Sequence, residues 1–79
     1  MKIKCFGIAK EIISNSILEI ENEQALKTVA DLRAHLLNHY EDLKKYKSFM
    51  VAVNQSYASD ETPINSSDEI AIIPPVSGG

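Results

Sequence analysis

The residues of this sequence best suited to chemistry are the last two, Gly78 and Gly79, which end the tail Pro74-Pro75-Val76-Ser77-Gly78-Gly79. Neither carries a side chain, so the terminal carboxylate can enter a channel too narrow for any Cβ atom. A carboxylate is a poor electrophile, but transfer of AMP to it gives a mixed anhydride that a persulfide sulfur can attack, leaving a thiocarboxylate. A terminal Gly-Gly is weak evidence by itself, because frayed glycine ends are common.

The prolines give this ending a shape. Pro74 and Pro75 hold φ near about −65° and remove two amide donors, so we expect the last strand to end at residue 73. Pro75 also biases Pro74 away from the helical region, so residues 74–79 are expected to be extended and to reach at most roughly 20 Å. Stiff residues, followed by Val76 and Ser77, reduce the entropy lost when the tail enters a partner's active site.

Other reactive side chains fit a structural role better. Cys5 alternates with Lys4 on the face shared with Ile3, which favours packing in the core over a role as sulfur acceptor. His35 and His39 are four residues apart and could share a metal on a helix, but Cys5, in a distant strand, is the only other soft ligand. We therefore predict no metal site and expect both histidines at the surface.

Composition limits the class of protein. A chain of 79 residues with 44% hydrophobic and 24% charged residues is expected to form one globular domain without a membrane span. A net charge of −3 with scattered lysines and arginines argues against nucleic acid as a partner. The single cysteine and the absence of a signal-peptide pattern indicate a cytoplasmic protein. The acidic pairs Asp60-Glu61 and Asp68-Glu69 either guide a basic partner or keep the domain soluble.

Hydrophobic periodicity predicts a mixture of strands and helix. Alternation and apolar runs indicate strands at residues 2–8, 17–20, 49–53, 56–58 and 70–73, with one helical turn possible at residues 9–13. Thr28 and Asp31 have the spacing of a helix N-cap, and Val29, Leu32, Leu36 and Tyr40 form an apolar stripe that runs to a helix end near His39, with Arg33 off the stripe. The continuous run at residues 49–53 is typical of a strand covered on both faces.

This order of elements predicts an α+β fold of the β-grasp, or ubiquitin-like, type, with a mixed sheet and one main helix packed on one face. The domain is expected to span residues 1–73 and the extended tail residues 74–79. Apolar residues on the other face need a second explanation. We expect Phe6, Tyr57 and Ile73 to form a partner interface, and the alternative is ordinary small-domain surface.

Two further segments carry a family resemblance over the whole chain. Phe6-Gly7-Ile8-Ala9-Lys10-Glu11 resembles a Phe-Ala-x-x-Arg-Glu segment, with Gly7 in place of alanine and Lys10 in place of arginine. Ala52-Val53-Asn54-Gln55 and Asp68-Glu69-Ile70-Ala71 precede the tail. Together these residues resemble the small subunits of molybdopterin synthase, a family of sulfur carriers of the MoaD/ThiS type.

The resemblance implies a subunit with no catalytic residues of its own. Its Gly79 would be adenylated by an activating enzyme related to ubiquitin-activating enzymes, which uses ATP with magnesium, and then converted to a thiocarboxylate. Gly78 and the tail would enter the large subunit of molybdopterin synthase, in a heterotetramer with two large subunits. The thiocarboxylate would donate sulfur to cyclic pyranopterin monophosphate during molybdenum cofactor biosynthesis. The carrier itself would bind no cofactor.

Two alternatives remain open from the residues. Sulfur carriers for thiazole or thiolated-nucleoside synthesis share the fold and Gly-Gly, although they usually lack the full Pro-Pro-Val-Ser-Gly-Gly ending. A protein modifier or a ubiquitin-like interaction module would instead form an isopeptide bond through its terminus or keep it as an unmodified carboxylate.

Overall fold

The five strands and the helices of this protein follow one another in the order expected of a mixed α+β domain. The computed structural model describes residues 1–21, 26–46 and 49–74. Its elements are β1 (Lys2–Cys5), α1 (Gly7–Ile13), β2 (Ile17–Glu19), α2 (Val29–His39), the 3-10 helix η2 (Glu41–Tyr46), β3 (Met50–Val53), β4 (Ser56–Ala58) and β5 (Ile70–Ile73).

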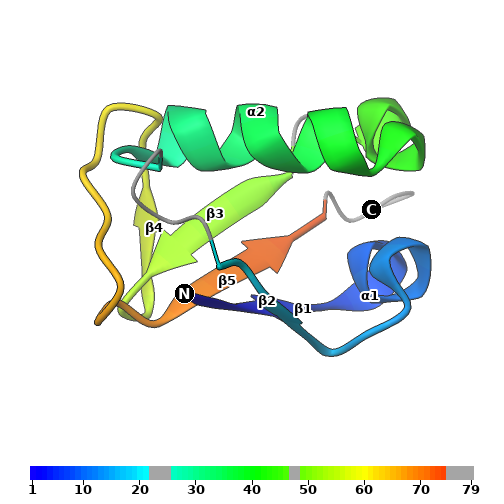
Figure 1. The fold of residues 1–79 in the computed structure, drawn as a ribbon, viewed down its shortest axis with the longest axis horizontal. Helices are drawn as coiled ribbons and strands as arrows, with labels where there is room; N and C mark the ends of the chain where they lie inside the picture. Colours follow the sequence, from blue (N-terminus) through cyan, green and yellow to red (C-terminus); the bar gives the residue numbers. More distant parts are fainter. Residues whose placement is uncertain (22–25, 47–48, 75–79) are drawn as a thin grey trace.

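The strands form one sheet in the order β2-β1-β5-β3-β4. The two central strands β1 and β5 run parallel, and every other neighbouring pair is antiparallel. Figure 1 shows α2 lying along one face of this sheet, with α1 beyond the end of β1. The predicted β-grasp arrangement, a mixed sheet with one main helix across it, is confirmed.

The core lies between α2 and the sheet. Alternate residues of the strands point into it, as the two-residue period of β1 predicts. The sheet contributes Ile3, Cys5, Val51, Ile70 and Ile72, and the covering layer contributes Val29, Leu32, Leu36 and Leu43. Burial of these apolar side chains on one face is the main stabilising contribution to the domain.

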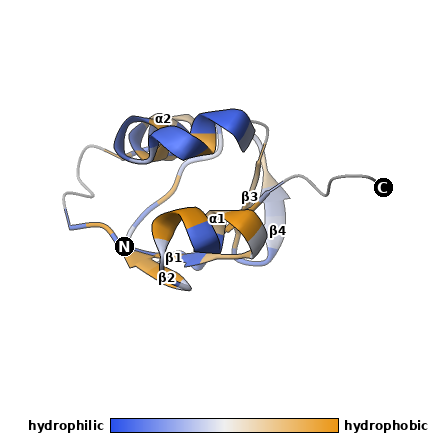
Figure 2. Ribbon diagram, turned by 90° about the vertical axis from the view of Figure 1, so that its right-hand side faces the viewer, coloured by the Kyte–Doolittle hydropathy of each residue, from blue (hydrophilic) through white to orange (hydrophobic). Residues whose placement is uncertain are grey.

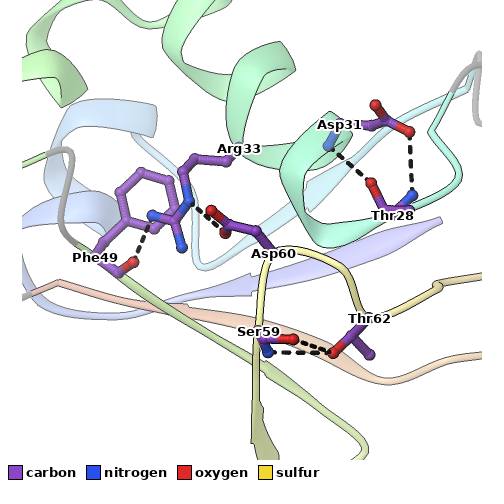
Figure 3. Close-up of polar contacts among 7 residues, drawn as sticks. All are labelled: Thr28, Asp31, Arg33, Phe49, Ser59, Asp60 and Thr62. Carbon is purple, nitrogen blue, oxygen red and sulfur yellow. Dashed lines mark hydrogen bonds and ion pairs between the residues drawn. The ribbon is translucent and has the colours of Figure 1, made fainter.

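The main helix begins where its N-cap residues predict. Asp31 N donates to Thr28 Oγ1 over 3.3 Å, and Thr28 N donates back to Asp31 Oδ2 over 3.1 Å, which closes a capping box (Figure 3). The amides of Lys27 and Thr28 hold the pKa of Asp31 below its ordinary value. The helix ends at His39, as predicted, and Tyr40 N donates to Leu36 O over 2.9 Å.

The first strand is shorter than its alternation suggests. We expected it to continue to Ile8, but β1 ends at Cys5 and Ile8 lies in α1. The physical reason is Gly7, whose φ of +56° turns the chain into the helix. A Cβ atom at this glycine would lie 3.4 Å from Pro74 Cγ, so the start of α1 packs against the residue that follows β5.

The Arg33 side chain lies off the apolar stripe, as predicted, and contacts residues that are distant in sequence. Its Nη1 donates to Phe49 O over 2.6 Å and its Nε lies 3.2 Å from Asp60 Oδ1 (Figure 3). The guanidinium carbon also lies 4.6 Å from the centroid of the Phe49 ring. One side chain thus joins α2 to the residue before β3 and to the connection between β4 and β5.

Replacing Arg33 tests this junction. We expect Arg33→Ala to lower the free energy of unfolding by about 2 kcal/mol, because the partly buried Phe49 carbonyl loses a charged donor. Arg33→Lys should recover only part of this stability, since an ammonium lacks the forked geometry. Asp60→Asn should cost little, because the Asp60 side chain is largely exposed and keeps a polar group beside Arg33. Urea denaturation gives the comparison, and equal losses for Arg33→Ala and Asp60→Asn would contradict it.

Gly7 and Ser14 provide a matched pair of changes at the two ends of α1. Both have positive φ, +56° for Gly7 and 67° for Ser14. Gly7→Ala should destabilise the domain by about 1 kcal/mol, whereas Ser14→Gly should stabilise it, because only glycine adopts this backbone region without a Cβ penalty. Thermal unfolding of both variants measures the two signs. Two shifts in the same direction would show that φ does not determine the effect.

Candidate functional site

The sheet face opposite α2 carries a row of side chains that crosses all five strands. The registers place Lys4 opposite both Ile17 and Ala71, and Ala52 opposite both Ala71 and Tyr57. Side chains of directly opposed residues point to the same face of a sheet. We call this surface the open face, defined by Lys4, Phe6, Ile17, Met50, Ala52, Tyr57, Ala71 and Ile73.

The open face is the apolar surface of the described domain. Its large exposed hydrophobic residues are Phe6 (49% exposed), Ile17 (50%), Met50 (43%) and Tyr57 (68%). Figure 2 shows α2 as a mostly hydrophilic layer on the other side of the sheet. Clustered apolar side chains of this kind mark interaction surfaces more often than scattered ones do.

The structure brings together the three residues expected at a partner interface. Phe6, Tyr57 and Ile73 all line one hollow of about 360 Å³ in the open face, together with Ala52 and Ala71. The polar members of its lining are Lys4, Gln55 and Glu69. Whether a partner occupies this hollow stays a prediction.

Sequence reasoning missed Met50 and Ile17. The run at residues 49–53 was expected to be covered on both faces, but Met50 alternates with the buried Val51 and is exposed, because no helix covers its side. Strict alternation within that run could have identified it. Ile17 could be placed only from the register of β2 on β1.

One ion pair lies within this apolar surface. Lys4 Nζ is 3.0 Å from Glu69 Oε2, and both side chains are about half exposed. The Lys4 ammonium, and more weakly the Gln55 amide, hold the pKa of Glu69 below its ordinary value. The turn before β4 holds Glu69 in place, since Asn54 N donates to Glu69 O and Glu69 N donates to Asn54 Oδ1, over 2.7 and 2.9 Å.

The tail begins beside the open face, at the end of the sheet where Phe6 and Ile73 lie. Cys5 pairs with Ile72 in the parallel β1–β5 ladder, so the next residues along each strand, Phe6 and Ile73, are neighbours. β5 ends at Ile73 and Pro74 is buried beside Gly7. Pro75, Val76, Ser77, Gly78 and Gly79 lie outside the described residues, and their roles stay predictions.

Of the other reactive side chains considered above, Cys5 is buried, His35 is half-buried and not at the surface as expected, and His39 is exposed as expected. Cys5 is buried, its Sγ lies 3.6 Å from Ile3 O, and burial raises the pKa of its thiol, which confirms the predicted core position. The rings of His35 and His39 stack with centroids 4.1 Å apart. Burial, and to a smaller extent the charge of His39, lowers the pKa of His35.

Within residues 1–21, 26–46 and 49–74, no three His, Cys, Asp or Glu side chains converge as metal ligands. Nor does any helix in these ranges have the length and apolarity to cross a membrane.

This geometry suits docking better than catalysis. The described part of the chain offers an apolar face, a single ion pair on it and the root of a tail at its edge.

Comparison with known proteins gives the family. The ThiS family model matches residues 3–79. The molybdopterin synthase sulfur carrier subunit of Dictyostelium discoideum is 40% identical over 81 residues, covering 99% of this chain and 94% of that protein.

Two solved structures extend the likeness to three dimensions. The complex of subunits 1 and 2 of the molybdopterin-converting factor from Helicobacter pylori contains a chain that is 28% identical, with a TM-score of 0.64, over 99% of this chain and 96% of that one. The small archaeal modifier protein 1 of Methanosarcina acetivorans is also 28% identical, with a TM-score of 0.75, over 99% and 94%. The chain therefore belongs to the ThiS family, and the predicted resemblance to sulfur carriers of the MoaD/ThiS type is confirmed.

Proposed function

We propose that this protein is the sulfur carrier subunit of a molybdopterin synthase and acts in molybdenum cofactor biosynthesis. The observation that carries the proposal is the 40% identity, over nearly the whole length of both chains, to a protein named for that role. The match of the family model up to Gly79 supports a function that includes the tail.

The chemistry proposed for Gly79 converts its carboxylate to a thiocarboxylate and, after sulfur transfer, back to the carboxylate. A terminal carboxylate oxygen attacks the α-phosphorus of ATP, with magnesium as counterion, and pyrophosphate leaves. The outer sulfur of a persulfide then attacks the acyl carbon and AMP leaves. A thiol then attacks the donor's own sulfur in the resulting acyl disulfide, so that the thiocarboxylate leaves and a disulfide forms between that thiol and the donor. The thiocarboxylate sulfur finally bonds to a carbon of cyclic pyranopterin monophosphate, from which an oxygen substituent leaves. Hydrolysis of the resulting thioester keeps the sulfur on the pterin and returns the carboxylate.

Catalysis of these steps is assigned to two partners in the cytoplasm. One is an adenylating enzyme of the ubiquitin-activating type, and the other is the large subunit, in a heterotetramer with two copies of each subunit. The solved complex of subunits 1 and 2 of the Helicobacter pylori molybdopterin-converting factor, which contains a chain similar to this one, supports a partner of the second kind. The open face is the proposed docking surface, because it adjoins Pro74 and therefore binds next to where the tail departs.

One observation favours a second candidate function. The chain is as similar to a small archaeal modifier protein as it is to the Helicobacter chain, at 28% identity in both cases. A modifier would use the same adenylate but transfer Gly79 to a lysine amine, forming an isopeptide. A carrier for thiazole or thiolated nucleosides would form the thiocarboxylate but deliver sulfur to a different acceptor.

Intact-mass analysis of the protein from its native cell separates these functions. We expect a species heavier by the difference between one sulfur and one oxygen atom, located at Gly79 by fragmentation. Incubation with the activating enzyme and ATP should yield the adenylate. Deletion of Gly79 should abolish both products and sulfur transfer to the pterin while leaving the unfolding temperature unchanged, since the core ends before the tail.

A substitution away from the tail serves as control. Lys45→Gln changes an exposed residue of η2, and it should leave both products unchanged. Sulfur transfer by the Gly79 deletion would contradict the proposal. Isopeptide conjugates through Gly79 in place of a thiocarboxylate would establish the modifier function instead.

A further inference from the structure

A second hollow of about 460 Å³ adjoins the open face near the exposed edge of Phe6. Lys4 and Phe6 line both hollows, so their side chains form the ridge between them. On the far side of this ridge the lining includes Lys10 from α1 and Ile17 from β2. The second hollow thus combines two ammonium groups with two large apolar side chains.

The charges of this hollow are of one sign. Lys4 and Lys10 line it, and no carboxylate among the described residues does. The Lys10 side chain is exposed, and its ammonium makes no ion pair or hydrogen bond with the part of the chain that the structure describes. Lys4 does pair with Glu69, but Glu69 lines the first hollow, on the opposite side of the ridge.

These two lysines do little for the isolated domain. A half-exposed pair such as Lys4–Glu69 contributes little to folding, and an unpaired Lys10 contributes less. A charge placed among apolar residues becomes consequential only when a partner covers it, because the ammonium then loses water and needs another acceptor. Each ammonium has three N–H donors, and Glu69 uses one of those on Lys4.

We propose that the large subunit docks on the open face with a carboxylate side chain in the hollow between Lys4 and Lys10. The neighbouring part of that subunit is apolar and packs against Phe6 and Ile17. This inference rests on the proposed function and adds to it the chemistry of the partner surface. The acidic residue fixes the orientation of the large subunit on the open face, while the apolar contacts supply most of the buried area.

A substitution that removes the Lys4 ammonium but keeps an apolar side chain of similar length provides the test. Lys4→Met keeps the apolar part of the side chain and eliminates the ammonium. Binding to the large subunit, measured by calorimetry at low salt, should weaken roughly tenfold if a carboxylate is left without its counterion. Lys4→Arg should bind nearly as well as the wild type. The difference between wild type and Lys4→Met should shrink at high salt, because screening weakens exposed charge pairs.

Two further variants exclude simpler explanations. Lys2→Met removes a charge from the same strand and the same face but outside both hollows, and it should change the dissociation constant by less than about twofold. Glu69→Gln breaks the ion pair but leaves the Lys4 charge, so binding should stay unchanged or become tighter. Circular dichroism of each variant verifies folding.

The sign of the Lys4→Met effect decides the proposal. Unchanged or tighter binding would overturn it, because methionine improves an apolar contact when no carboxylate faces it. Weakening by Glu69→Gln equal to that by Lys4→Met would also overturn it, since the intact ion pair would then be the recognised feature. A loss seen with the activating enzyme but not with the large subunit would reject the chosen partner.

Failure of this inference is distinguishable from failure of the proposed function. If Lys4→Met binds normally and the wild type still acquires a thiocarboxylate, only the acidic partner contact is wrong. If the wild type never acquires a thiocarboxylate with the activating enzyme, ATP and a persulfide donor, the carrier function itself is wrong.

Discussion

A five-stranded sheet has two faces, and this chain has one long helix to cover them. The α2 helix and η2 enclose the alternating residues of β1, β3 and β5 on one side, which buries all the largest core side chains. The same alternation leaves Met50, Tyr57 and Ile17 on the other side, where nothing in the described chain covers them. The open face is therefore a direct consequence of having one long helix for a sheet with two faces. Because this face is apolar, covering it with a partner makes a favourable contribution to the free energy of binding.

Parallel pairing of β1 with β5 places the C-terminal ends of these two strands side by side. An antiparallel pair would place the end of β1 beside the start of β5, far from the tail. The parallel ladder instead places Phe6 beside Ile73 and Gly7 beside Pro74. The open face and Pro74, from which the tail continues, therefore lie at the same end of the sheet. In the proposed complex, a partner that covers the open face also lies next to the start of the tail. This proximity lowers the entropy lost when the tail binds.

Local patterns predicted most elements of this fold, and the errors arose where geometry depends on distant residues. The capping box at Thr28 and Asp31, the helix end at His39 and the last three strands all follow from short-range rules and agree with the structure. The end of β1 did not, because alternation continued through Gly7 while its positive φ turned the chain. Arg33 was missed because its partners, Phe49 and Asp60, are distant in sequence. Met50 and Ile17 required the register across strands, which no single-strand pattern contains.

A carrier of this kind has to reconcile stability with an uncovered apolar face. A small domain buries a modest fraction of its surface, so exposed apolar side chains reduce the margin against unfolding and favour aggregation. Lys4 and Glu69 interrupt the apolar surface at its centre with a hydrated pair. A partner that covers this surface must supply an acceptor for the Lys4 ammonium, so a partner without one loses binding free energy. In the proposed complex the Lys4 charge therefore favours an acidic partner over an apolar one, a selectivity that a purely apolar face would lack.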